Sequence, residues 1–100
     1  MAAAALEHEF LDLAKTRQWG IVKKLVAEHP ALVNAQPGGR WSALHQAAGA
    51  DHAELVTWLL ARKADARART RAGETALDLA PSAPVRRVLE GVAAGAGAAG

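Results

Sequence analysis

Hydrophobic residues recur along the chain in groups that have the spacing of one face of an α-helix. In residues 55–60 the apolar side chains occupy positions i, i+1, i+4 and i+5, which lie together on a helix. The same group occurs 34 residues earlier, and its last part occurs again 29 residues later. The three groups are Ile21, Val22, Leu25 and Val26, then Leu55, Val56, Leu59 and Leu60, and finally Val85, Val88 and Leu89. They predict three amphipathic helices in succession, with a shortened third unit.

A shorter motif precedes the second and third of these helices. Residues 42–47 read SALHQA and residues 75–80 read TALDLA, at an offset of 33. A fainter copy, at Leu11 and Ala14, lies 33 residues upstream of the first. Both clear copies begin with a hydroxyl residue of the kind that caps helix N-termini. We therefore predict units made of a short helix, a turn, a longer helix and an extended loop, at about residues 6–39, 40–72 and 73–90.

The composition favours helices over strands. Alanine, the best helix former, makes up about half of the hydrophobic residues, and aromatic residues are only 4% of the chain. Residues with high strand propensity form few runs. The loops at residues 34–40 and 67–73 contain Pro-Gly and Ala-Gly pairs, which are typical of turns. These features predict an all-α fold with protruding hairpin loops.

The segment from Arg40 to Ala80 resembles the ankyrin repeat. It shares with that family a Leu-His opening, paired alanines, a histidine before the second helix, a leucine run, an Ala-Asp step and a glycine before the next unit. The matching residues are Ser42, Leu44, His45, Ala47, Ala48, His52, Leu59, Leu60, Ala64, Asp65 and Gly73. The resemblance extends more weakly over residues 6–90. It implies three stacked helix–turn–helix repeats, an α-solenoid with short hairpin loops.

Several residues depart from the ankyrin pattern. Lys63 and Asp51 stand where the family has glycine in the left-handed backbone region, which costs a residue such as lysine about 1 kcal/mol. Arg67 replaces a common asparagine, and this puts the hydrogen bonding within its loop in doubt. The first and third units are irregular, as expected for the end units of a stack.

Motifs that would carry catalysis are sparse. The chain has no cysteine, which excludes disulfides, thiolate catalysis and cysteine-ligated zinc. It has no phosphate-binding or dinucleotide-binding fingerprint, and no two histidines have the i, i+4 spacing of a zinc pair. We therefore expect no enzymatic activity, no cofactor and no metal. For His45 the resemblance implies a structural role, in hydrogen bonding between neighbouring repeats.

The chain shows no sign of a membrane or secretion signal. No apolar stretch reaches membrane-spanning length, and the alanine-rich start lacks the basic region of a signal peptide. The net charge of +2 at pH 7 is small. We expect a monomer without membrane contact, located inside the cell and in the cytoplasm. Residues 91–100, almost all glycine and alanine, are predicted to form a flexible tail.

The resemblance implies a protein–protein interaction module, a scaffold or adaptor that binds a partner protein on a concave face of hairpins and short helices. Trp41 is a candidate anchor because aromatic and arginine residues dominate interface hot spots. Packing of Trp41 against the neighbouring hairpin explains its presence equally well. The contact residues that we expect on this face are Gln36, Arg40, Trp41, Gln46, Arg69, Thr70, Arg71 and Glu74.

Basic residues alternate along the second loop. In an extended hairpin Arg67, Arg69 and Arg71 would point the same way. Such a patch could pair with carboxylates of a partner protein or with phosphates. The alternative function is therefore binding of nucleic acid or another polyanion through residues 67–71, although acidic residues elsewhere interrupt a continuous basic stripe. An ordinary solvated loop explains the charges as well.

Overall fold

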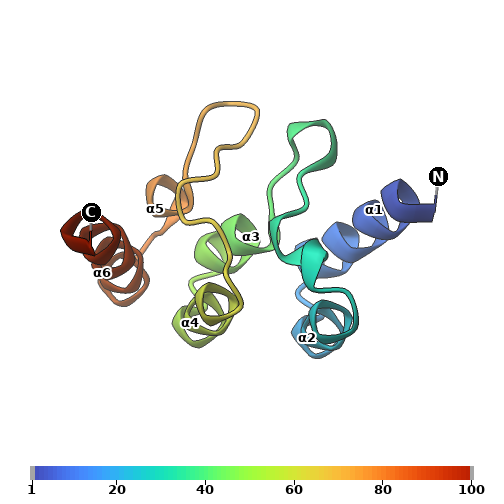
Figure 1. The fold of residues 1–100 in the computed structure, drawn as a ribbon, viewed down its shortest axis with the longest axis horizontal. Coiled ribbons are helices and arrows are strands. Elements are labelled where there is room, and N and C mark those ends of the chain that lie inside the picture. Colours follow the sequence, from blue (N-terminus) through green and yellow to red (C-terminus); the bar gives the residue numbers. More distant parts are fainter. Residues whose placement is uncertain (1, 100) are drawn as a thin grey trace.

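The fold consists of paired helices in two layers (Figure 1). The structure, a computed structural model, describes the backbone from Ala2 to Ala99 and the side chains of residues 5–91. The inner layer contains α1 (Ala2–Lys15), α3 (Ala43–Gly49) and α5 (Ala76–Leu79), and the outer layer contains α2 (Trp19–Glu28), α4 (Ala53–Ala61) and α6 (Ala83–Ala99). No strand occurs between Ala2 and Ala99. The expected all-α fold of helix–turn–helix repeats is confirmed.

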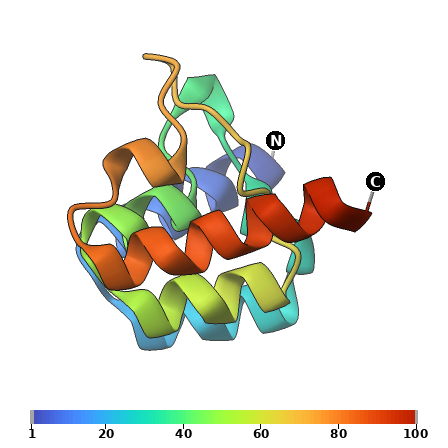
Figure 2. The ribbon, with the colours of Figure 1, turned by 90° about the vertical axis from the view of Figure 1, so that its left-hand side faces the viewer.

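Two loops connect one helix pair to the next and rise away from the helices (Figure 2). The first loop, residues 29–42, contains two short 3-10 turns, η1 (Pro30–Asn34) and η2 (Pro37–Gly39). The second loop, residues 62–75, has no helical turn of its own. Both loops lead into an inner helix, so they stand beside each other along one edge of the inner layer (Figure 1).

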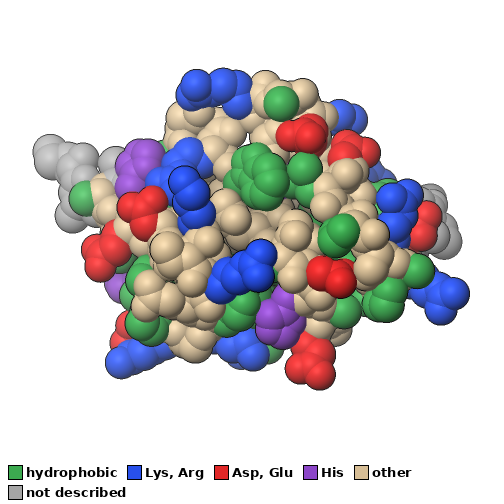
Figure 3. Space-filling view, turned by 180° about the vertical axis from the view of Figure 1, so that it is seen from behind, with side chains coloured by type: hydrophobic (Ala, Val, Ile, Leu, Met, Phe, Trp, Pro, Cys, Tyr) green, Lys and Arg blue, Asp and Glu red, His purple; other side chains and the backbone are tan. Residues whose placement is uncertain are grey.

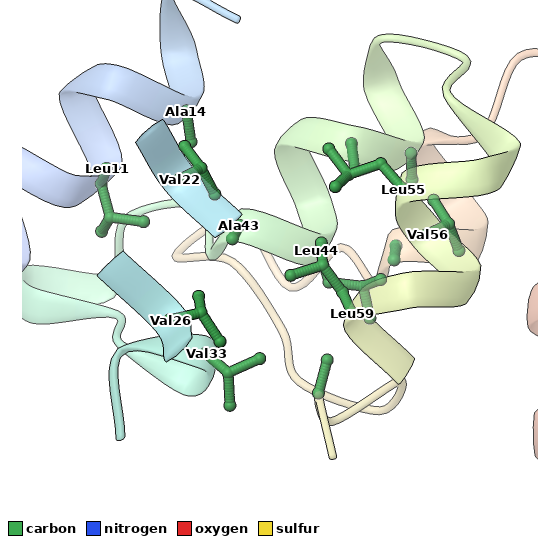
Figure 4. Close-up of a cluster of buried hydrophobic side chains, with 14 of the residues drawn as sticks. Leu11, Ala14, Val22, Val26, Val33, Ala43, Leu44, Leu55, Val56 and Leu59 are labelled. Carbon is green, nitrogen blue, oxygen red and sulfur yellow. The ribbon is translucent and has the colours of Figure 1, made fainter. Parts of the chain in front are cut away.

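The hydrophobic core lies between the two layers (Figure 4). In the middle unit, α3 and α4 bury Leu44, Leu55 and Leu59, each at most 2% exposed. Alanines on the inner helices, such as Ala43 and Ala47, are fully buried and alternate with these larger side chains, so that the layers can interdigitate. Burial of a leucine side chain contributes about 1.5–3 kcal/mol, so these leucines are a major source of stability.

The caps predicted for two inner helices are present. The Ser42 hydroxyl accepts a hydrogen bond from the His45 N–H at 3.4 Å, and His45 Nδ1 accepts one from the Ser42 N–H at 3.1 Å. Thr75 and Asp78 form the same reciprocal pair, at 3.3 and 2.9 Å. Hydrogen bonds from the N–H and hydroxyl of Thr75 lower the pKa of the Asp78 carboxyl group. Helix α4 is capped by His52, whose Nδ1 accepts from the N–H three residues later at 3.2 Å.

One residue of the predicted apolar stripes is exposed. Ile21 of α2 is 46% exposed, whereas Leu55, which occupies the same place in α4, is fully buried. Helix α2 is the outer helix at one end of the stack (Figure 1). It therefore has a neighbouring unit on one flank only, and part of the stripe that is buried in the middle unit faces solvent here.

The last helix is longer than the sequence pattern predicts. Helix α6 continues to Ala99 and so includes most of residues 91–100, for which a flexible tail is expected. The side chains beyond Gly91 lie outside the described residues, and the flexibility of this segment stays a prediction. Neither α6 nor another helix in the described part of the chain has the length and hydropathy needed to cross a membrane.

Three residues other than glycine lie in the left-handed backbone region. Arg17 and Asp51 have φ angles of 62°, and Lys63 has a φ angle of 72°. Each follows the end of a helix, where the chain must turn. The left-handed geometry predicted for Asp51 and Lys63 is confirmed, whereas that of Arg17 was not foreseen from the sequence.

Replacing Lys63 by glycine should stabilise the protein. We expect Lys63→Gly to raise the free energy of unfolding by about 1 kcal/mol, because glycine adopts this φ without the steric conflict of a Cβ. The Lys63 side chain is exposed, so little packing is lost. Urea unfolding followed by circular dichroism measures the change. Lys63→Ala keeps the Cβ and is the control, and equal stability of the two variants would contradict the prediction.

Candidate functional site

A buried histidine connects α3 to the second loop. His45 is 1% exposed. Its Nε2 lies 3.0 Å from the carbonyl oxygen of Ala68 and 3.2 Å from that of Glu74, one on each arm of the loop. Its Nδ1 lies 2.8 Å from the Ser42 hydroxyl oxygen. These contacts give His45 the role between repeats that the resemblance implies.

The surroundings of His45 select one protonation state. Both carbonyl oxygens can only accept, so Nε2 must carry a proton and donate it. Nδ1 accepts from the Ser42 N–H and so carries none. Burial lowers the pKa of His45 below the ordinary value of 6.5, and the contacts with the carbonyls of Ala68 and Glu74 offset only part of this effect. The neutral imidazole is therefore the form that fits the folded protein.

Two amide side chains of the first loop hold the loops together. Asn34 donates to the carbonyl of Lys63 at 3.1 Å and accepts from the N–H of Asp65 at 2.7 Å. Gln36, one of the expected partner contacts, donates to the carbonyl of Arg69 at 2.8 Å. The Gln36 side chain thus contributes to the loop architecture.

A second connection between the loops is made by Arg71. Its N–H donates to the carbonyl of Gly39 at 3.0 Å, and its guanidinium donates to the carbonyl of Gly38. Gly39 has a φ of 77°, and a Cβ there would lie 3.2 Å from the Cβ of Arg71. The close approach of the loops therefore requires glycine at this position.

The second loop is also closed by bonds of its own. The Thr70 N–H donates to the carbonyl of Glu74 at 2.8 Å, and the Thr70 hydroxyl accepts from the Glu74 N–H at 3.2 Å. The Arg69 guanidinium reaches the carbonyl of Gly73 at 2.8 Å. Arg67 and Arg69 line a pocket beside α5 and α6, away from the first loop. The prediction that the three arginines point the same way is wrong, because the contact between the loops turns Arg71 toward the first loop.

An open groove crosses the inner helices below the loops. One part of it, about 390 Å³, is lined by Lys15, Arg40, Trp41 and Gln46. A second part, about 260 Å³, shares Lys15, Trp41 and Gln46 with the first and extends to Leu79 of α5. Figure 3, which views the molecule from behind, shows a hydrophobic area near its centre, with Lys and Arg side chains on one flank and Asp or Glu side chains on the other. Three of the expected contact residues, Arg40, Trp41 and Gln46, meet in this groove.

Trp41 forms the apolar wall of the groove. Its side chain is 36% exposed, and its ring lies against the end of α3, where a Cβ added to Gly49 would be 3.2 Å from it. The ring thus rests on the short helix of its own unit. The remaining surface of the ring faces the groove, where it can contact a partner.

Arg40 connects the first loop to α1. Its guanidinium lies 2.9 Å from Asp12 Oδ1 and 3.0 Å from His8 Nδ1. A guanidinium can only donate, so this nitrogen of His8 accepts the bond. The side chains of Arg40 and Asp12 are 27% and 70% exposed, and such a pair contributes less than about 1 kcal/mol. Arg40 therefore shapes the rim of the groove, with its charge shared with Asp12.

Lys15, Arg17 and Leu79 line the groove although no sequence motif identifies them as site residues. Lys15 and Arg17 lie at the end of α1, and Leu79 is the last residue of α5. They come together with Trp41 only because α1 and α5 both pack against α3. In the sequence, the only local sign of this groove is the pair of positive charges at Lys15 and Arg17, which are separated by one residue.

The other tryptophans belong to the outer layer. The ring of Trp58 has Lys23 Nζ 5.5 Å and the Arg62 guanidinium 4.8 Å from its centre, in cation–π contacts. Trp19 meets His52 edge to face, with 6.1 Å between ring centres. These contacts connect α2 with the middle unit and give Trp19 and Trp58 structural roles.

Comparison with known proteins points to one family. A family model for ankyrin repeats (many copies) matches residues 25–80. Alpha-latrocrustotoxin-Lt1a from Latrodectus tredecimguttatus is 36% identical over 63 residues, which are 63% of this chain and 4% of the toxin. The chain thus corresponds to a small part of that relative. No solved structure matches the chain significantly.

His45 should make the stability of the protein depend on pH. Because the folded state lowers the pKa of His45, the unfolded chain takes up a proton at a higher pH than the folded chain does. The stability that neutral His45 contributes is complete above about pH 6.5, the ordinary pKa of histidine. It is lost as the pH falls from there toward the pKa of His45 in the folded protein. Urea unfolding at a series of pH values measures this loss.

His45→Gln is the control for the pH dependence. It removes the titrating group, so its stability should fall less steeply below about pH 6.5 than that of the wild type. An NMR titration of the His45 ring in the wild-type protein reports the folded pKa directly. If the stability of the wild type and of His45→Gln fell equally with pH, and the His45 ring titrated at the ordinary pKa of histidine, the lowered pKa of His45 would be refuted.

Proposed function

Because the chain belongs to the ankyrin repeat family, we propose that it binds another protein on the concave face formed by the two loops and the short inner helices. Ankyrin repeats are in general protein–protein interaction modules and not enzymes. The observation that carries the proposal is the exposed ring of Trp41 beside an open groove that crosses all three inner helices. A partly exposed tryptophan in a concave surface is typical of a binding anchor.

The rigidity of the loops supports this face as the binding surface. Asn34, Gln36 and Arg71 connect the first loop to the second, and His45 connects the second to α3. A surface that is already ordered loses less conformational entropy when a partner binds. The loops therefore present a preformed edge above the groove.

The expected contact residues take two kinds of role in this proposal. Trp41 and Gln46 face the groove directly, and Arg40 forms its rim. The remaining five have side chains or backbone groups engaged in hydrogen bonds of the loops, which keep the face in shape. Thr70 is only 7% exposed, so its expected place among the contact residues is not supported, and the other four could contact a partner only through their outer atoms. These five are Gln36, Arg69, Thr70, Arg71 and Glu74.

Binding of a polyanion through the second loop has less support. The guanidinium groups of Arg69 and Arg71 donate to backbone carbonyls and lie on different sides of the loop. Phosphate binding along a strand of nucleic acid needs several cations in one continuous stripe. The cytoplasmic location and the monomeric state stay predictions from the sequence.

Trp41→Ala should weaken partner binding while the fold is retained. If Trp41 is a hot spot, the loss is about 2 kcal/mol or more, about a 30-fold increase in the dissociation constant. Affinity capture from cell extract with quantitative mass spectrometry compares proteins retained by the wild type and by the variant. Circular dichroism establishes that both are folded.

Trp58→Phe is the matched control for this experiment. It also changes a tryptophan, but one on the outer layer, so it should retain every protein that the wild type captures. Proteins lost from both variants would reflect altered stability. Retention of all wild-type partners by folded Trp41→Ala would remove the groove from the binding site.

A further inference from the structure

We propose that the groove beside Trp41 takes an acidic segment of a partner, in which a large apolar side chain stands next to one or more carboxylates. This inference rests on the proposed function and specifies the partner's chemistry. It follows from three features of the groove, which are its unbalanced positive charge, its apolar wall and a cation held in a costly backbone conformation.

The groove is positively charged. Lys15, Arg17 and Arg40 line its two parts, and no carboxylate lines either part among residues 5–91. Arg40 is paired with Asp12 at 2.9 Å, and within the same residues neither Lys15 nor Arg17 has an ion-pair partner. The carboxylates of an acidic segment would supply the missing counter-charges, and like charges would be repelled.

The apolar residues of the groove favour a partner segment that has an apolar side chain next to those carboxylates. Trp41 and Leu79 offer apolar surface along the second part, and Gln46 between them has an amide that can bond to a peptide backbone. A lone surface ion pair contributes little, so charge by itself would not hold a segment. An aliphatic or aromatic side chain against the Trp41 ring provides burial, and the cations provide selectivity.

Arg17 is held in a conformation that favours glycine. Its φ is 62°, and its side chain makes no hydrogen bond within residues 5–91 that would offset the cost. Asp51 has the same φ at the corresponding turn of the middle unit, but its carboxylate accepts a hydrogen bond from the Ser82 hydroxyl. The Arg17 side chain therefore contributes a charge to the groove and no hydrogen bond to the fold within residues 5–91.

Two matched substitutions test the role of Arg17. Arg17→Gly and Lys63→Gly each remove one positive charge and each relieve a residue in the left-handed region, at φ values of 62° and 72°. Only Arg17 lines the groove. Both variants should therefore have a higher Tm than the wild type, and only Arg17→Gly should bind an acidic segment more weakly.

The probe is a phage-displayed library of random twelve-residue peptides selected on the immobilised wild-type chain. We expect enriched peptides to contain Asp or Glu beside a large apolar residue. A synthetic peptide with the most enriched sequence should bind Arg17→Gly about fivefold more weakly than the wild type at low salt, the upper end for one exposed ion pair. Lys63→Gly should bind as the wild type does, and the difference should shrink at high ionic strength.

The outcomes separate this inference from the proposed function. Peptides without acidic enrichment, or equal affinities of Arg17→Gly and Lys63→Gly, overturn the acidic partner, while weaker binding to Trp41→Ala in the same assay would still support the concave face. Enriched peptides that bind Trp41→Ala as tightly as the wild type overturn the groove itself. If the selection yields no peptide above the protein-free control, the result counts against the acidic partner and against the proposed binding face.

Discussion

The hydrogen bonds of His45 hold the second loop against the inner helix α3, and the shape of the concave face depends on them. One neutral imidazole donates to carbonyls on both arms of the loop and accepts from the N–H of Ser42, the first residue of the helix cap. Because the ring is buried, leaving one of these groups without a partner would cost about 1–3 kcal/mol. The third unit has Asp78 in the same place. A carboxylate can cap its own helix but cannot donate to a loop.

The first loop reaches its position through the second. Asn34 and Gln36 bind backbone groups on the second loop, and Arg71 binds backbone groups on the first. These bonds join segments about 30 residues apart, and they leave the groove bounded by a fixed edge of loops above and by helices below. The proposed binding face therefore has a preorganised edge, which lowers the entropy cost of binding a partner.

Three residues at the ends of helices lie in the left-handed backbone region, and they differ in what offsets its cost. Asp51, Lys63 and Arg17 all adopt a backbone conformation that glycine would occupy at lower cost. Asp51 gains a hydrogen bond with Ser82, and Lys63 places its carbonyl where Asn34 binds it. Arg17 makes no such side-chain bond among the described residues, and it borders the groove.

The sequence by itself determined the helices, their order and the starts of α3 and α5. Helix formation and capping depend on residues within about four positions of each other, so the repeated motif and the caps at Ser42 and Thr75 could be recognised directly. Only the tertiary structure decided where Arg71 points, why Ile21 is exposed and which cations meet Trp41. Those features depend on contacts between repeats, or on the lack of a neighbouring repeat, and the spacing of residues within one repeat carries no information about them.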